Sequence, residues 1–379
     1  MIIGVPRELK NRERRVALTP DGAAQLVAAG HVLRIEQNAG KGSGFSDADY
    51  ATAGAQVLAK DAVWEADLVV KVKEPLPEEY GFLRPQMFLF TYLHLAAEPQ
   101  LVDVLLANKV RAIAYETVQT DNGALPLLAP MSRIAGRVAA QIGAHLLQAE
   151  NGTPFVGKGV LMGGEPPANV IIIGGGHAGR AAASVACGMG AAVRIFDVSA
   201  ACVADLNKTF VKKMPGERCA ARFFDMNACT VDEWAVALND CDLLIGAALI
   251  VGEHAPQLLE ARHLARMAGG VFVDISIDQG GMSASSRPTS YAEPVYVEAG
   301  VLHCCLPNLP AAVPVSATHA LTVATLPWLQ KLAGTGITAA MCDTALARGV
   351  NTWDGQLVHR GVAHALGIPF TSLEALIVD

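Results

Sequence analysis

Three ionisable side chains, Arg15, Lys73 and His94, each follow the end of a predicted strand in the first half of the chain. Ligands of open α/β sheets bind beyond the carboxyl ends of the strands. An arginine offers a fork for a carboxylate, a lysine offers a point charge, and a histidine exchanges protons near neutral pH. The three side chains could therefore converge on one small anion. Each has a structural alternative, as a surface residue in a charged loop, a lysine at a strand edge or a buried core histidine.

Two further polar residues follow predicted strands in the second half. Asp278 lies in VFVDISIDQGG, and Asn308 lies in the segment PNLP. Asp278 could orient water or act as a base, or it could be a turn residue before a glycine pair. Asn308 could bind substrate or the cofactor amide, or it could form an Asx turn. Asp274, inside its strand, is interpreted as structural.

The segment VIIIGGGHAGRAAASVACGMGAAVRIFD carries a glycine fingerprint. Gly174, Gly176 and Gly179 follow a strand, open an Ala-rich helix and precede a second strand that ends in Asp197. This order is typical of dinucleotide-binding folds, in which the glycines allow a tight turn, close approach of the pyrophosphate and close packing of helix and strand. A carboxylate at Asp197 would accept hydrogen bonds from the ribose and repel a 2′-phosphate. The pattern favours NAD over NADP, and no second flavin-type signature accompanies it. His177, inside the loop, is interpreted as a solvated loop residue.

Short apolar runs without polar alternation predict two parallel sheets covered by helices on both faces. Thr19-Pro20 should begin one helix, which Gly30 should end. Strands are expected at 1–5, 32–36, 67–72, 87–93 and 110–116, then at 170–173, 192–196, 221–224, 242–247, 270–275 and 301–306.

The connections between these series predict the domain organisation. A long helix is expected at 132–148 with Ser132 as its cap, and a Gly- and Pro-rich connector is expected at 149–169. Strand signals stop after residue 306, and the rest reads as helices. If that tail returns to the first sheet, the fold is α/β with two doubly wound Rossmann-like domains. Its boundaries are a discontinuous substrate domain at 1–131 and 307–379 and an NAD domain at 132–306.

The composition excludes several classes of protein. Hydrophobic residues make up 52% of the chain and charged residues 17%, but the uncharged stretch at 299–330 is interrupted by prolines and cannot be a spanning helix. The N-terminus has no signal-peptide pattern. A net charge of −7 disfavours nucleic-acid and membrane partners. The eight cysteines form no CxxC, which favours reduced thiols, a cytoplasmic location and no metal site.

Nine segments occur together in one order: GVPRELKNRERRVALTP, GSGFSD, KVKEP, TYLHLA, AYETVQ, PLLAPMS, GGGHAG, DISIDQGG and NLPAAVP. On these motifs the chain resembles the alanine dehydrogenase/nicotinamide nucleotide transhydrogenase family over nearly its full length. The resemblance implies a bilobed protein with a discontinuous substrate domain, a central NAD domain and a homohexameric assembly. It also implies reversible oxidative deamination of L-alanine to pyruvate and ammonia.

The resemblance implies roles for individual residues. Arg15 matches the family's substrate-carboxylate arginine, Lys73 its substrate lysine, His94 its acid/base and Asp278 its catalytic aspartate. The remaining matches are the ribose acid, a cofactor-contacting serine and an active-site asparagine, at Asp197, Ser132 and Asn308.

The chain departs from the family pattern at two places. A basic residue is common shortly after the ribose acid, where this chain has Cys202, and the segment from Cys304 to Pro307 also differs.

Three other functions stay open. They are a transhydrogenase NAD-binding subunit, which would need a proton-channel partner, an opine-type or other amino-acid dehydrogenase, and a noncatalytic NAD sensor.

Overall fold

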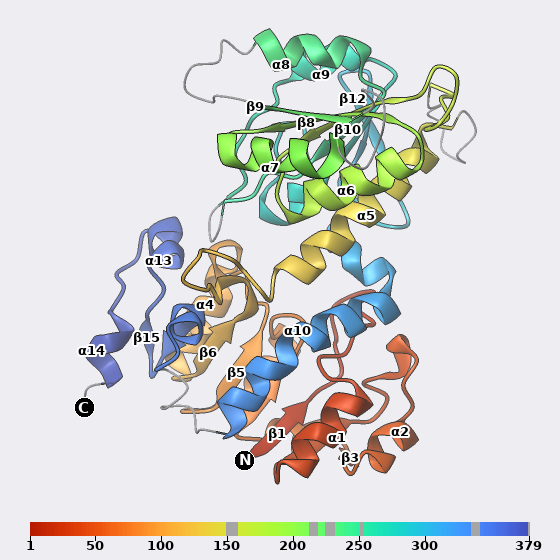
Figure 1. Ribbon diagram of the computed structural model, residues 1–379. Coiled ribbons are helices and arrows are strands. Elements are labelled where there is room, and N and C mark those ends of the chain that lie inside the picture. Colours follow the sequence, from red (N-terminus) through yellow and green to blue (C-terminus); the bar gives the residue numbers. More distant parts are fainter. Residues whose placement is uncertain (149–157, 212–218, 224–231, 251–253, 335–341, 378–379) are drawn as a thin grey trace. The chain divides into compact units, whose positions relative to one another are not determined.

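A computed structural model describes residues 1–148, 158–211, 219–223, 232–250, 254–334 and 342–377. The chain divides into two compact units (Figure 1). Unit 1 comprises Met1–Met131 and Ala311–Asp379, and unit 2 comprises Ser132–Ile250 and His254–Pro310. The second division therefore falls after Pro310, so that Asn308 lies in unit 2.

Unit 1 contains an eight-stranded sheet in the order β15-β14-β6-β5-β4-β1-β2-β3. The first six strands of the chain are parallel to one another. Their order is that of dinucleotide-binding folds, with the chain direction reversing between β1 and β4. The bounds are β1 (Ile2–Val5), β2 (Val32–Glu36), β3 (Gln56–Leu58), β4 (Leu68–Val70), β5 (Phe88–Thr91), β6 (Arg111–Ala114), β14 (Val350–Trp353) and β15 (Gln356–Leu357).

The expectation that strands stop after residue 306 is wrong. β14 pairs antiparallel with β6, and β15 pairs antiparallel with β14. All four residues of β14 are buried. The short run VNTW mixes polar and apolar residues, so its sequence lacks the apolar pattern of a buried strand. It becomes a strand because β6 offers it an unpaired edge.

The C-terminal segment packs within unit 1. In Figure 1 the blue helix α10 (Pro314–Gly334) lies by the red N-terminal elements, and two hydrogen bonds fix it there. The Val16 amide donates to the Thr318 hydroxyl over 3.2 Å, and the hydroxyls of Ser43 and Thr318 lie 2.7 Å apart. The other helices are α1 (Pro20–Ala28), α2 (Asp47–Thr52), α3 (Lys60–Trp64), α4 (Pro99–Ala107), α12 (Thr344–Gly349), α13 (Arg360–Leu366) and α14 (Leu373–Ile377).

The predicted boundaries of α1 are confirmed. The Thr19 hydroxyl accepts a hydrogen bond from the Gly22 amide, and Pro20 occupies the first helical position. Gly30 follows the helix at φ +89°, in the left-handed region that ends many helices.

Unit 2 contains a seven-stranded sheet in the order β12-β13-β11-β10-β7-β8-β9. All pairs are parallel except β12 with β13, and the chain direction reverses between β7 and β10. The bounds are β7 (Asn169–Ile173), β8 (Ala192–Asp197), β9 (Cys219–Phe223), β10 (Leu243–Gly246), β11 (Val271–Asp274), β12 (Tyr296–Glu298) and β13 (Val301–Cys304). The predicted α/β class with two parallel sheets is therefore confirmed.

The helices of unit 2 correct two predictions. Helix α5 (Ala129–Leu146) begins before Ser132, which therefore lies in the first turn and not at the cap. Helix α6 begins at His177, so that residue is the exposed first residue of a helix and not a loop residue. The other helices are α7 (Ala200–Val211), α8 (Asp232–Ala237) and α9 (Ala261–Leu264). The connector predicted at 149–169 lies partly outside the described residues.

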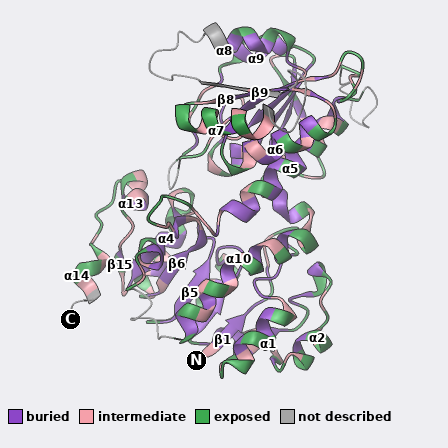
Figure 2. Cartoon of the chain, in the orientation of Figure 1, coloured by how far each residue is buried: buried purple, intermediate pink, exposed green. Residues whose placement is uncertain are grey.

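Figure 2 shows the central strands of each sheet as buried and the outer faces of the helices as exposed. One core of unit 1 packs Leu89, Leu105 and Ala112 around Trp64. A core of unit 2 packs Ile171, Leu244 and Phe272 between the sheet and its helices. Across the described parts of the chain, no helix is long and apolar enough to cross a membrane.

Candidate active site

The carboxyl ends of four neighbouring strands in unit 1 carry the ionisable groups. Arg15 follows β1, Lys73 follows β4 and His94 follows β5. Glu116 follows β6, in a short 3-10 turn. Because β6, β5, β4 and β1 are adjacent and parallel, these ends share one edge of the sheet, on both sides of the point where the chain direction reverses. This is the position where open α/β sheets bind ligands.

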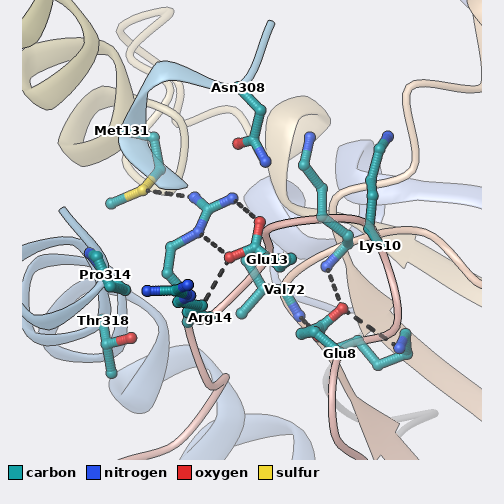
Figure 3. Close-up of polar contacts among 12 residues, drawn as sticks. Glu8, Lys10, Glu13, Arg14, Val72, Met131, Asn308, Pro314 and Thr318 are labelled. Atoms are coloured by element: carbon teal, nitrogen blue, oxygen red, sulfur yellow. Dashed lines mark hydrogen bonds and ion pairs between the residues drawn. The ribbon is translucent and has the colours of Figure 1, made fainter. Parts of the chain in front are cut away.

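The Arg15 guanidinium is fixed by a carboxylate two residues before it. Its side chain is 2% exposed and forms two parallel hydrogen bonds with Glu13, whose side chain is completely buried. Another guanidinium nitrogen lies 3.2 Å from the sulfur of Met131 (Figure 3). Burial would lower the pKa of Arg15, but Glu13 outweighs it and raises that pKa. The guanidinium is therefore permanently charged and held in one orientation.

A cavity of about 460 Å³ in unit 1 adjoins this pair. The loops after β1 and β2 form its walls, so its lining combines Arg14, Arg15 and Lys41 with the carboxylates of Glu8 and Glu13. Both carboxylates have cationic partners, at Lys71 and Arg15. Cations therefore remain available at the mouth of the cavity, which suits a small anionic ligand.

Glu8 ties the loop after β1 to the end of β4. Its carboxylate accepts hydrogen bonds from the Val72 amide over 2.6 Å and the Lys73 amide over 3.3 Å, and it lies 3.3 Å from the Lys71 amine. Figure 3 shows Glu8 beside Val72. Burial, only partly offset by Lys71, raises the pKa of Glu8 to about 7. These bonds fix the backbone from which the Lys73 side chain extends.

A second carboxylate beside Lys73 stays ionised. Glu74 forms an ion pair with Lys10. Burial would raise the pKa of Glu74, but the charges of Lys73 and Lys10 outweigh it and lower that pKa. The loop after β1 is thus joined to the end of β4 at two places, by Glu8 and by Lys10.

His94 is held in a strained backbone conformation. Its φ is +50°, a left-handed value that costs energy for a residue other than glycine. The Glu116 carboxylate accepts hydrogen bonds from the His94 amide over 2.7 Å and the Leu93 amide over 3.2 Å. The ring stacks on Tyr92 at 5.8 Å between centroids. Strain of this kind recurs at functional sites because the surroundings must impose it.

The environment of His94 keeps its ring neutral. Burial and the nearby positive charges of Lys73, Lys10 and Arg15 lower the pKa of His94 to about 3, although Glu74 opposes them. At neutral pH the imidazole therefore has a lone pair that can accept a proton.

The structure adds four residues that sequence reasoning missed. Glu13 and Glu8 lie in the charged run for which a solvated loop was the structural alternative, whereas both are buried. Tyr92 and Glu116 lie in the segments TYLHLA and AYETVQ, in which only His94 was predicted to belong to the site. The signal for Glu8, Tyr92 and Glu116 was an ionisable or phenolic residue within three residues of a strand end, whereas Glu13 lies too far beyond β1 to carry that signal.

The glycine loop of unit 2 has the shape that the fingerprint requires. A Cβ on Gly179 would lie 1.8 Å from the Gly174 carbonyl oxygen, and one on Gly174, at φ +99°, would lie 2.6 Å from the Ala247 oxygen. A Cβ on Gly176 would meet no atom within 4 Å. Two glycines are thus required by packing, whereas the third leaves open space in front of the helix. That combination fits the close approach of a dinucleotide pyrophosphate.

Asp197 ends β8 directly beside this loop. One carboxylate oxygen accepts a hydrogen bond from the Gly175 amide over 2.6 Å, and the other accepts from the Ser199 amide over 2.7 Å. Both oxygens keep lone pairs for further donors. The carboxylate is therefore oriented by the backbone and can still accept ribose hydroxyls.

Two other predicted site residues meet in unit 2. The Asn308 amide donates to the Asp278 carboxylate, at 3.1 and 3.2 Å from its two oxygens. Asn308 has φ +56°, and Asp278 is exposed in a 3-10 turn after β11. Asp274 is structural as expected, because it accepts bonds from the Ser276 and Met282 amides. Ser132 lies half-buried on α5, where the structure does not test its predicted contact with the cofactor.

Comparison with known proteins identifies relatives along the whole chain. The family described as alanine dehydrogenase/PNT, N-terminal domain, matches residues 4–135, and the corresponding C-terminal domain matches residues 139–360. An alanine dehydrogenase from Mycolicibacterium smegmatis is 47% identical over 381 residues, covering 98% of each chain. One from Geobacillus stearothermophilus is 43% identical and covers 100% of both chains.

Solved structures give the same relationship. A structure titled L-alanine dehydrogenase is 45% identical and superimposes with a TM-score of 0.87, covering 97% of this chain and 99% of that one. A transhydrogenase from Sinorhizobium meliloti has a TM-score of 0.75 over 95% of this chain and 99% of that one. Its sequence identity is 21%, so that likeness concerns the fold alone.

Proposed function

Because this chain belongs to the alanine dehydrogenase/PNT family, we propose that it catalyses the NAD-dependent, reversible oxidative deamination of L-alanine to pyruvate and ammonia. The observation that carries the proposal is the edge of the unit 1 sheet. Two cations, Arg15 and Lys73, lie there beside a histidine that is neutral at pH 7. A carboxylate substrate that loses protons during its oxidation needs both kinds of group.

Arg15 and Lys73 are proposed to bind the alanine carboxylate. The Arg15 fork is already oriented by Glu13, so little side-chain entropy is lost when the substrate binds. Lys73 adds a point charge, and its backbone is fixed by Glu8. Holding the carboxylate in this way fixes the α-carbon, and orientation of this kind supplies much of the rate enhancement in enzymes.

His94 and Asp278 are proposed to move protons. Oxidation removes a hydride from the α-carbon and a proton from the amino group, which gives an imine. Water then adds to the imine carbon, and ammonia leaves as pyruvate forms. His94 is neutral at pH 7, so its ring is in the unprotonated form that a proton acceptor requires. Asp278, held by the Asn308 amide, would orient the water.

Unit 2 is proposed to bind NAD, which supplies the hydride acceptor when it is bound. Gly174, Gly176 and Gly179 would let the pyrophosphate approach the start of α6. Asp197 would accept hydrogen bonds from the adenosine ribose. Ser132 is assigned a cofactor contact from family resemblance.

The domain roles and the assembly are also proposals. Residues 1–131 and 307–379 would form the substrate domain, and residues 132–306 would form the NAD domain. The family resemblance implies a homohexamer, and the cysteine pattern favours a cytoplasmic location. Sedimentation equilibrium of the full chain tests the hexamer, which a monomeric or dimeric mass would contradict.

The assay that tests the proposed function measures NADH formation by the purified full chain with L-alanine, and NADH consumption with pyruvate and ammonia. An N-carboxyalkyl amino acid in place of alanine tests the opine-type alternative. Preferred oxidation of that compound would overturn the proposal. A chain that binds NAD but oxidises neither compound would be a sensor. Arg15→Ala and His94→Ala test the site, because wild-type turnover in both variants would contradict the assignment.

A further inference from the structure

Arg180 lies under the glycine loop, on the first turns of α6. Its Nε donates to the Gly175 carbonyl oxygen over 2.9 Å, and its guanidinium forms an ion pair with Asp205 on α7. A further nitrogen lies 3.5 Å from the Cys202 sulfur. The guanidinium is thus held by three groups, although 31% of the side chain remains exposed.

Asp197 and Arg180 hold opposite ends of one residue. The Asp197 carboxylate accepts from the Gly175 amide, and Arg180 donates to the Gly175 carbonyl. The Cys202 thiol also donates to that carbonyl over 3.3 Å. Burial raises the pKa of the Cys202 thiol, while Arg180 lowers it and Asp197 raises it. The guanidinium and the ribose acid both bind Gly175, and the guanidinium also contacts the Cys202 sulfur.

Part of the Arg180 guanidinium remains available to bind a ligand. A guanidinium has five N–H donors. Three of its donors are directed at Gly175, Asp205 and Cys202, so among the described residues two have no acceptor. The Asp205 side chain is 62% exposed, and a surface pair of this kind binds weakly. Arg180 could therefore turn from Asp205 to a stronger anion at low cost.

We propose that Arg180 is a latent ligand for a ribose 2′-phosphate, so that Asp197 alone makes this chain select NAD over NADP. The inference rests on the proposed NAD binding in unit 2. With Asp197 present, its charge repels the 2′-phosphate and its oxygens accept the ribose hydroxyls. Once that charge is removed, the guanidinium already in place binds the phosphate through charge-assisted hydrogen bonds. No new basic residue has to be introduced after β8.

Calorimetric titration of the full chain with NAD, NADP and 2′,5′-ADP tests the proposal without measuring activity. Asp197→Ser should bind NADP and 2′,5′-ADP at least about tenfold more tightly than the wild type does, the effect of one charge-assisted hydrogen bond. Asp197→Ser combined with Arg180→Met should lose that gain. Asp197→Ser combined with Arg262→Met, a control at an exposed arginine of α9, should keep it.

The outcomes separate this proposal from the proposed function. The role of Arg180 would be overturned if Asp197→Ser gained equal affinity for NADP when combined with Arg180→Met and when combined with Arg262→Met. The role of Arg180 would also be overturned if Asp197→Ser gained no affinity for NADP and 2′,5′-ADP while the wild type still binds NAD. If the serine variant does not fold, Asp197→Asn replaces it, because the amide oxygen can still accept from Gly175. If the wild-type chain binds no NAD at all, the proposed function fails together with this inference.

Discussion

The carboxylate of Glu13 binds the guanidinium of Arg15 through two parallel hydrogen bonds, and both side chains are buried in unit 1. A buried charge is costly unless a partner compensates it. Glu13 therefore allows the protein to keep a cation in its interior and fixes the direction of the fork. The proposed substrate clamp is thus oriented before any carboxylate binds.

Glu13→Ala should lower the free energy of unfolding by roughly 3–5 kcal/mol, because it leaves Arg15 buried without its carboxylate. The same change should raise the KM for L-alanine, because the fork is no longer oriented. Denaturant unfolding and steady-state kinetics measure the two effects.

Glu65→Ala is the matched control for Glu13→Ala. Glu65 is 74% exposed and lies 3.8 Å from Arg34, a surface pair that should contribute less than about 1 kcal/mol. Equal losses of stability in the two alanine variants would contradict the structural role of Glu13.

Glu116→Ala removes the acceptor for two backbone amides, Leu93 and His94. The loss of stability should be about 1–3 kcal/mol. Because His94 would leave its left-handed conformation, kcat with alanine should fall about a hundredfold, a loss typical of a displaced catalytic group. Glu116→Gln keeps one amide oxygen as an acceptor and should recover part of both losses, measured by unfolding and by turnover.

The control for Glu116→Ala is Glu78→Ala, at an exposed carboxylate in unit 1. It should leave stability and turnover near wild-type values. A Glu116→Ala variant with unchanged kcat would show that Glu116 does not position His94.

The lowered pKa of His94 makes stability depend on pH. The unfolded histidine binds a proton below about pH 6.5, whereas the folded one does so only near 3. As pH falls through this window the unfolded state binds more protons, so the stability contributed by His94 is present above 6.5 and is lost below it. The unfolding free energy should fall by up to about 1.4 kcal/mol per pH unit relative to a variant without the histidine.

His94→Asn is that variant, because asparagine tolerates the left-handed conformation. Chemical unfolding of both proteins at a series of pH values gives the difference, in which the contributions of other groups such as Glu8 largely cancel. A constant difference across the window would contradict a neutral His94.

Alanine substitutions at three glycines of unit 2 distinguish a glycine required for packing from one required for ligand binding. Gly179→Ala should disrupt the loop, because its Cβ would lie 1.8 Å from the Gly174 oxygen. Gly176→Ala should fold normally but bind NAD weakly, because its Cβ would enter the space assigned to the pyrophosphate. Gly188→Ala, at the end of the same helix with no atom within 4 Å, should fold and bind as the wild type does. Thermal unfolding and NAD titration of the three variants check this order.

The sequence predicted the elements whose signals are local. The glycine fingerprint, the cap at Thr19 and all eleven expected strands correspond to elements of the structure. Their apolar runs and turn residues act within a few positions of the chain. The sequence also predicted that Arg15, Lys73 and His94 follow strand ends. Because neighbouring parallel strands end at the same edge of a sheet, the three residues were expected to lie together.

The remaining features depend on contacts between distant segments. β14 is a strand because β6 pairs with it, and no local sequence signal identifies a partner so far away in the chain. The charged run around Glu13 resembles a solvated loop, yet Glu13 and Arg15 within it are buried because their charges neutralise each other. Ser132 was misplaced because Pro130, which the first turn of a helix tolerates, let α5 begin earlier. The role of Arg180 requires α6, α7 and β8 to be in place.

The central claim is that this chain transfers the α-hydrogen of L-alanine to NAD. The direct measurement is the mass of the reduced cofactor formed from L-alanine deuterated only at the α-carbon. The account predicts that the deuterium appears in the reduced nicotinamide, and that alanine deuterated only in its methyl group gives unlabelled cofactor. Reduced cofactor without the α-deuterium, or no reduced cofactor at all from a chain that binds NAD, would contradict it.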